Sequence, residues 1–180
     1  MAIQVHNVFI SFYHGDEQYK RDFERRFSDQ YHVFISTSVQ EGDIHPNTNT
    51  NAIRQRIRDI YLRDSSVTIV LVGNETWKRK HIDWEIASSI RQTDFNPRSG
   101  LFGILLPTYT KVNNRFSPFT ISPRLYANIE CGYFKIYNWS ENPQEVYAWI
   151  RKAYERSRRI DPDNSLTPFA RNRSGSHWQP

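Results

Sequence analysis

The sequence is poor in cysteine and contains no long apolar run. Cys131 is the one cysteine among 180 residues, which excludes an internal disulfide framework and favours a reducing compartment. No stretch approaches the roughly 20 apolar residues of a membrane-spanning helix. The opening residues, "MAIQVHNVFISF", enter a strand pattern at once and lack the basic region and cleavage site of a secretion signal. We therefore expect a cytoplasmic protein with no membrane partner.

Glycine is also scarce, and the glycine motifs that bind phosphates are missing. The chain has 7 glycines and contains neither GxGxxG nor a GxxxxGK loop, which argues against a Rossmann dinucleotide turn and a P-loop. A receiver domain would need an aspartate at the end of the third expected strand, where this chain has Gly73 and Asn74. The 6 histidines show no metal-ligand spacing, so we expect no metal and no bound cofactor. No nucleophile elbow is present, although a Ser-His-Asp arrangement stays open.

The positive charge is concentrated at the C-terminal end. Residues 151–180 hold 7 Lys and Arg against 3 Asp and Glu, within a formal net charge of +5 for the whole chain. The basic residues of a nucleic-acid binder usually cluster on a structured face, whereas "RSRRIDPDNSLTPFARNRSGSHWQP" is polar and lacks periodicity. We therefore expect a globular domain, 1–160, followed by a solvated basic tail, 161–180, and no nucleic-acid partner.

Five stretches read as strands, and three of them are nearly continuous apolar runs, typical of a parallel sheet buried on both faces. These stretches are 5–13, 31–36, 65–73, 100–107 and 132–139. Helical spacing of apolar residues lies between them, around Phe23, Ile57, Ile86 and Ile150. The order predicts an α/β, flavodoxin-like, open five-stranded parallel sheet with helices on both faces. Two polar segments, 37–51 and 108–131, are expected to be long loops.

In an open α/β sheet, a ligand binds outside the carboxyl ends of the strands, at the point where the strand order reverses. For a flavodoxin-like order, that crevice lies between the first and third strands, so the segments 12–17 and 73–85 should meet there. Glu85, beside the helical stripe of isoleucines in "HIDWEIASSI", is the candidate catalytic residue. The candidate substrate-binding residues are Phe12, Tyr13, His14, Asp16, Ser36, Trp77, His81 and Trp84.

A lone carboxylate among aromatic side chains suits one reaction type. When the bond between nicotinamide and ribose in NAD breaks, nicotinamide leaves as a neutral molecule, so no general acid is required. The transition state resembles an oxocarbenium ion, which a carboxylate such as Glu85 stabilises. Trp84 and Tyr13 would then stack on the nicotinamide or adenine ring.

Each of these residues also has a plainer interpretation. A glutamate in the first turns of a helix is favoured by the helix dipole alone. Trp77 and Trp84 have the size of packing residues, and His14 and His81 suit surface or capping positions. Asp16 has the type and place of a helix N-cap.

Two segments carry a resemblance to a known family. "NVFISFYHGDEQYKRDF" resembles the first box of Toll and interleukin-receptor (TIR) domains. "DSSVTIVLVGNETWKRKHIDWEIASSI" resembles the central region of the bacterial TIR-like family that includes the TIR subunit of the Thoeris anti-phage defence system. The resemblance covers roughly residues 5–107. It implies a flavodoxin-like fold and NAD as substrate rather than cofactor, with Glu85 as the catalytic glutamate.

The resemblance further implies that the chain makes an ADP-ribose-derived signal for a separate effector, and that it self-associates through TIR–TIR contacts. The product stays open among free ADP-ribose, a cyclic isomer and a conjugate. His81 stands where the family often has tryptophan, and the 37–51 loop lacks the usual Pro-Gly turn. Two alternatives also stay open: a TIR module that only assembles with partners, and an enzyme similar to nucleoside deoxyribosyltransferases.

Overall fold

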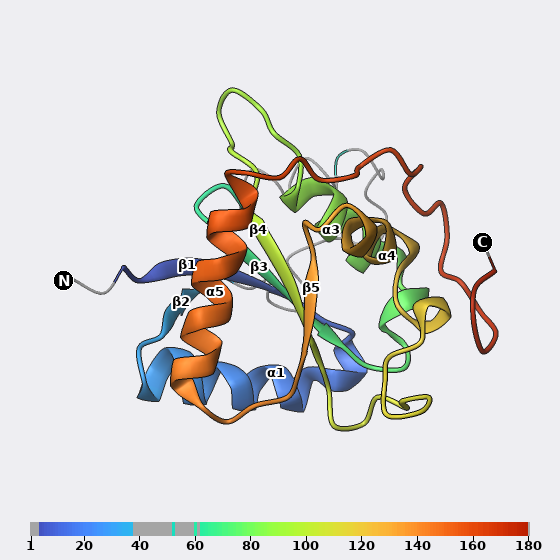
Figure 1. Cartoon of the computed structure of the whole chain (residues 1–180), viewed down its shortest axis with the longest axis horizontal. Helices are drawn as coiled ribbons and strands as arrows, with labels where there is room; N and C mark the ends of the chain where they lie inside the picture. Colours follow the sequence, from blue (N-terminus) through green and yellow to red (C-terminus); the bar gives the residue numbers. More distant parts are fainter. Residues whose placement is uncertain (1–3, 38–51, 53–59, 61, 180) are drawn as a thin grey trace.

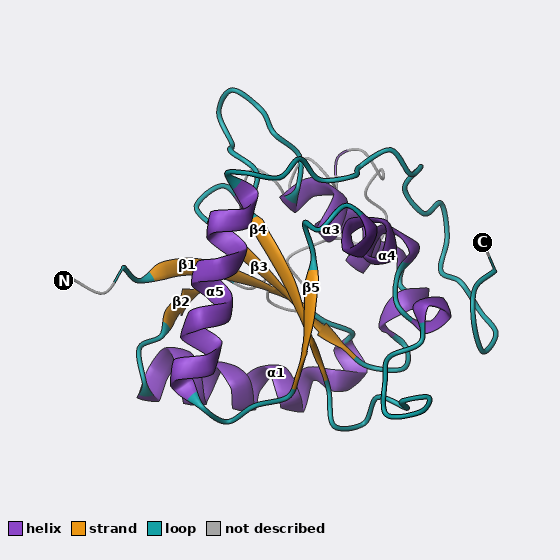
Figure 2. Ribbon diagram, viewed as in Figure 1, coloured by secondary structure: helices purple, strands orange, loops and turns teal. Residues whose placement is uncertain are grey.

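A computed structural model describes residues 4–37, 52, 60 and 62–179 of the chain. Its centre is a five-stranded, all-parallel sheet with the strand order β2-β1-β3-β4-β5. The strands are β1 (His6–Ser11), β2 (Phe34–Ser36), β3 (Val67–Val72), β4 (Gly100–Leu105) and β5 (Lys135–Asn138). Figures 1 and 2 show the sheet between two layers of helices. The expected flavodoxin-like α/β fold is confirmed.

The strands in the middle of the sheet are those that the apolar runs predicted. All six residues of β3, "VTIVLV", are buried, and so are all six of β4. Strands buried on both faces have no need of polar alternation. Because β1 pairs with β2 on one side and with β3 on the other, the strand order reverses between β1 and β3, and their carboxyl ends open the crevice there.

Two apolar clusters fill the space on the two faces of the sheet. One contains Phe23 and Ile150, from α1 (Glu17–Phe23) and α5 (Pro143–Ser157), and extends to Phe27 in a π-helical stretch, Glu24–Gln30. The other joins Ile86 of α3 (Lys80–Ser89) to Leu125 of α4 (Pro123–Glu130). The helical pattern around Ile57, like most of the 37–51 loop, lies outside the described residues.

The prediction of a loop over 108–131 is wrong in its last third, because α4 lies there. The inward residues of α4 are Arg124, Leu125 and Asn128. Two of these three are polar, so the apolar spacing within the helix is short, with Leu125 buried and Ile129 partly buried one turn later. The pair Ser122-Pro123, with proline at the first helical position, was the available signal.

The expectation of a solvated C-terminal tail is also corrected by the structure. Residues 161–179 form no helix or strand, but they pack over α3 and α4, and Figure 1 shows them in red on that side of the molecule. Phe169 and Trp178 are only 7% and 9% exposed. The backbone N–H of Trp178 donates to Phe119 O (2.9 Å), and its indole N–H donates to Ile121 O (2.6 Å). A few aromatic anchors and backbone hydrogen bonds therefore order a segment of polar composition.

Among the residues described, no helix combines the length and the apolar character that crossing a membrane requires.

Candidate active site

Glu85 lies where α3 passes the carboxyl end of β1. Ile82, Ile86 and Ile90 are buried in the core, which turns the adjacent helix face, with Glu85, toward the last residue of β1. There the hydroxyl of Ser11 donates a 2.5 Å hydrogen bond to Glu85 Oε2. The side chain of Glu85 is 8% exposed. It is therefore a buried carboxyl group at the carboxyl edge of the sheet, and not a solvated helix carboxylate.

The environment of Glu85 favours its neutral form. Burial raises the pKa of Glu85 to about 8, and the Ser11 hydrogen bond offsets only part of that rise. No described basic side chain forms an ion pair with it. A positively charged ligand that approached this carboxyl would favour its ionised form.

The loop after β1 brings three of the expected binding residues to this edge. The rings of Tyr13 and His14 lie 4.4 Å apart, centroid to centroid. His81, one helical turn before Glu85, hydrogen-bonds to the backbone of Phe12. Burial lowers the pKa of His81 more than that hydrogen bond raises it, and nearby positive charges lower it further. His81 is therefore a neutral imidazole at neutral pH.

Asp16 completes the same loop, but it does not act as a capping side chain. It stands at the N-cap position of α1 without a side-chain capping hydrogen bond. Its Oδ2 atom is buried and has no hydrogen-bond partner within the described part of the chain. A Cβ atom on Gly73 would lie 2.5 Å from this oxygen, so glycine at the end of β3 makes room for the carboxylate. Burial, followed by the charge of Glu75, raises the pKa of Asp16.

Ser36 is connected to the loop after β1 through the side chains of Glu24 and Lys20. Its hydroxyl donates to Glu24 Oε1 (2.5 Å), and Glu24 Oε2 pairs with Lys20 Nζ (2.8 Å). Lys20 Nζ lies 5.6 Å from the ring centroid of Phe12. These contacts place Ser36 on the far rim of the Phe12 loop, and not beside Glu85.

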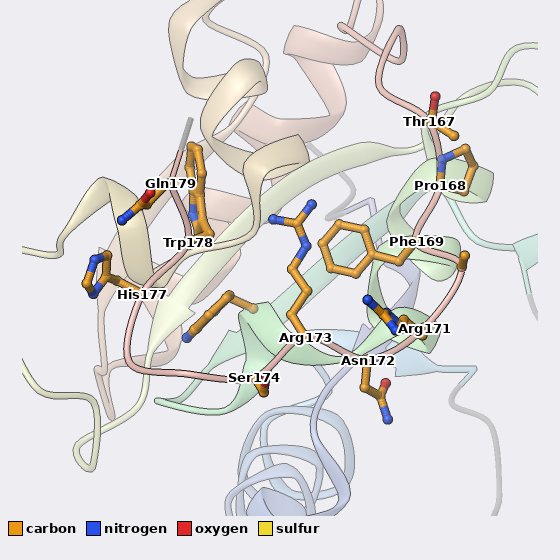
Figure 3. A pocket seen from close by; sticks show the side chains of 12 residues that line it. Thr167, Pro168, Phe169, Arg171, Asn172, Arg173, Ser174, His177, Trp178 and Gln179 are labelled. Carbon is orange, nitrogen blue, oxygen red and sulfur yellow. The ribbon is translucent and has the colours of Figure 1, made fainter.

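The two tryptophans that were expected to stack on a ligand are engaged elsewhere. Trp84 is 2% exposed, and its indole N–H donates to Phe169 O (2.8 Å). Trp77 is buried and lines a pocket of about 780 Å³ whose other walls come from residues 167–174 and 177–179. Figure 3 shows this pocket, where the guanidinium of Arg173 packs 4.2 Å from the ring centroid of Phe169. Glu85 is not part of its lining, so the structure does not bring Trp77 and Trp84 to the Glu85 site.

Sequence reasoning missed two residues of the site. Ser11 is the hydrogen-bond partner of Glu85, and its signal was a polar residue at the end of an otherwise apolar strand. Arg79 precedes α3 and places its guanidinium 4.2 Å from the ring centroid of Tyr13, while its Nη2 donates to Glu75 Oε2 (3.0 Å). Its Nε is buried without a hydrogen-bond partner among the described residues. Nothing in the sequence pattern distinguished Arg79 from the other basic residues of "WKRK".

The described residues contain no group of three or more His, Cys, Asp or Glu side chains placed to hold a metal ion.

Comparison with known protein families agrees with this geometry. The family model described as "Thoeris protein ThsB, TIR-like domain" matches residues 9–111, from β1 through β4 and the residues that follow it. The match includes Ser11, the loop after β1, and all of α3 with Glu85. No curated protein matches the chain. The match covers more than half of the chain, so the protein belongs to the family of Thoeris ThsB TIR-like domains, a TIR family with a role in anti-phage defence.

Proposed function

We propose that the protein cleaves the bond between nicotinamide and ribose in NAD and makes an ADP-ribose-derived signal in anti-phage defence. One observation carries the proposal: Glu85 is buried, accepts a hydrogen bond from Ser11 at the carboxyl end of β1, and has no ion-pair partner among the described residues. A carboxyl group in such a place costs folding free energy, and a cationic ligand offsets that cost.

The proposed reaction needs no protonation of the leaving group. The C–N bond breaks, and its electron pair leaves with nicotinamide, which neutralises the pyridinium ring. The ribose is left as an oxocarbenium-like centre, which ionised Glu85 stabilises across the dry site. Water then adds and releases a proton to give ADP-ribose, or a hydroxyl group adds in its place to give a cyclic isomer or a conjugate.

The residues around Glu85 supply the remaining contacts in this proposal. Phe12 and Tyr13 offer ring faces to the nicotinamide or adenine ring. Asp16 Oδ2, a buried acceptor without a partner in the described chain, can accept a hydrogen bond from a ribose hydroxyl. His81, neutral and close to Phe12, can accept or donate a hydrogen bond without adding charge. NAD itself is the substrate, and no further cofactor takes part.

The signal would act on a separate effector, and the enzyme would work as an assembly of TIR domains. β2 is one of the two edge strands of the described sheet, and Ile35 on it is 55% exposed. An edge strand leaves backbone N–H and C=O groups unpaired, which makes it a ready surface for contact with another copy. A non-catalytic assembly module would use the same surface. The enzyme and the assembly module are therefore distinguished by measuring NAD cleavage, and not by the shape of this surface.

The deciding experiment measures nicotinamide release from NAD by the purified protein, with and without extract from phage-infected cells. Release by the wild-type protein, and its loss in Glu85→Gln, would support the proposal. If the folded wild-type protein releases no nicotinamide under either condition, the non-catalytic assembly module is the remaining TIR function. Turnover of a deoxynucleoside in place of NAD would instead indicate a nucleoside deoxyribosyltransferase-like enzyme.

A further inference from the structure

Residues 163–173, here called the strap, run antiparallel along α3. Asn164 lies beside the end of the helix, Phe169 beside its middle and Asn172 beside its start, as their hydrogen bonds to Ala87, Asp83 and Lys80 show. α3 is the helix that carries Glu85. The strap therefore follows the whole length of the helix that positions the candidate catalytic group.

Both ends of α3 depend on the strap for hydrogen bonds. The residue at the N-cap position, Arg79, makes no side-chain capping hydrogen bond. The backbone N–H of Lys80 instead donates to Asn172 Oδ1 (3.0 Å), and Asn164 Nδ2 donates to Ala87 O near the other end (3.0 Å). Helix ends leave such groups without intrahelical partners, so two asparagines from outside the helix satisfy one group at each end.

The middle of α3 is held by the peptide groups of Phe169. The backbone N–H of Phe169 donates to Asp83 Oδ2 (2.9 Å), and its carbonyl accepts from the indole of Trp84 (2.8 Å). Asp83 is fully buried and also accepts from Arg124 Nε of α4 (2.8 Å). Arg124 in turn donates to Asn164 Oδ1 (2.7 Å) and Leu166 O (3.0 Å) of the strap. One buried ion pair thus connects α3, α4 and the strap.

The hydrogen bonds from the strap restrict the position of α3 along its own axis. The helix has 10 residues and rests on the sheet through its buried isoleucines, whose apolar contacts are non-directional. The hydrogen bonds of the strap are directional, and they are made at three heights along the helix. Displacements of about 1 Å at a reacting group can cost about a hundredfold in rate, so the axial position of α3 matters for Glu85.

We propose that the strap is a positioning element of the active site, which fixes the axial position and rotation of α3 and so holds Glu85 against Ser11. The expected effect on turnover rests on the proposed function. The effect of the strap on the position of α3 and Glu85 does not. Asn164 and Asn172 are positioning residues in it, since neither touches the Glu85 site.

The test uses full-length protein with Asn164→Ala and Asn172→Ala combined, and Asn172→Ala alone in case the pair does not fold. The first control is Arg171→Ala with Ser174→Ala, two exposed residues, one in the strap and one directly after it, whose side chains make no polar contact with the described residues. The second is Val146→Ala in α5, which destabilises the opposite layer without touching α3. Nicotinamide release is followed with the infected-cell extract present.

We expect kcat of the asparagine variant to fall about 10- to 100-fold while KM changes much less, and both controls to keep kcat within about twofold. A parallel ¹³C NMR titration follows the Glu85 carboxyl, assigned by its loss in Glu85→Gln. Its pKa should move toward the ordinary value as water enters, in the asparagine variant only. An unchanged kcat, or an equal fall in the Val146→Ala control, overturns the proposal.

If the wild-type protein releases no nicotinamide, the proposed function fails and the titration alone decides the inference. A Glu85 pKa that is lower in the asparagine variant than in both controls supports the strap as the device that holds α3. The same pKa in all four proteins refutes it.

Discussion

Replacing Glu85 by glutamine should make the protein more stable and less active. The ordinary pKa of the carboxyl group is 4.5, and burial raises it to about 8 in the folded protein. Each unit of that difference corresponds to about 1.4 kcal/mol. At pH 8 and above, the ionised carboxylate therefore lowers the free energy of unfolding by about 4–5 kcal/mol. Glutamine keeps the shape and the contact with Ser11 but carries no charge.

The sign of the effect follows from proton binding. Below pH 4.5, Glu85 is neutral in both the folded and the unfolded chain, and the favourable contribution of the neutral buried group is fully present. Between pH 4.5 and about 8 the unfolded chain ionises first and binds fewer protons, so that contribution is progressively lost as pH rises. Glu85→Gln does not titrate. Its advantage over wild type should grow from near zero at pH 4.5 to about 3 kcal/mol at pH 7, a rise of about 6–12 °C in Tm.

Activity should move in the opposite direction. Removing the charge that stabilises the oxocarbenium-like centre should lower nicotinamide release by about 10²–10³ in kcat. The matched control is Glu145→Gln, because Glu145 also lies in a helix and accepts a 2.5 Å hydrogen bond from a serine, Ser140, but is exposed. It should cost about 0.3–1 kcal/mol and leave turnover unchanged. Thermal melts from pH 4.5 to 9 check the stability. A pH-independent difference between Glu85→Gln and wild type would show that Glu85 is solvated.

Further outcomes are expected from the same structure. kcat/KM for NAD should rise with pH up to about 8 as Glu85 ionises in the free protein. Ser11→Ala removes the hydrogen bond that lowers the pKa of Glu85, so this variant should shift the pH profile to higher pH. A profile that is flat from pH 6 to 9 would contradict both expectations. Arg124→Met should lower the free energy of unfolding by about 3–5 kcal/mol, measured by urea unfolding, because Asp83 would stay buried without its ion-pair partner. Ending the chain after Pro162 should lower the free energy of unfolding by at least about 3 kcal/mol, since the buried side chains of Phe169 and Trp178 are lost. An unchanged melting curve would show that the segment is a solvated tail. Exhaustive chelation should leave turnover unchanged, and recovery of a lost activity by a divalent ion would refute this.

The fold was predictable from the sequence because its central strands carry their own signal. β3 and β4 are buried along their full length, so their apolar runs needed no context to be read. α4 was not predictable in this way, because it buries Arg124 and Asn128, whose partners lie far away along the chain. The apolar residues on the same side of α4, Leu125 and Ile129, make a stripe of only one turn.

The candidate site was predicted in part, and the division follows from helix geometry. Parallel topology brings the loop after β1 to the start of α3, so Tyr13, His81 and Glu85 could be assigned to one edge before any coordinates. Consecutive helical residues point about 100° apart, however, so Trp84 could not share the direction of Glu85. It faces the strap instead. Trp84 and Glu85 were expected to share one site because they are neighbours in the sequence, but neighbouring side chains of a helix point in different directions.

The C-terminal segment shows why composition alone misleads. Residues 161–179 are rich in Arg, Asn, Ser and Pro, which is the composition of a disordered end. Their order comes from long-range contacts: Asn164 with Ala87, Phe169 with Asp83, and Trp178 with Ile121. No local pattern encodes these contacts, because each partner belongs to another element. A polar segment becomes ordered when a buried carboxylate needs hydrogen-bond donors that its own helix does not supply. Asp83, two residues from Glu85, is such a group, and its donors are the side chain of Arg124 and the backbone N–H of Phe169.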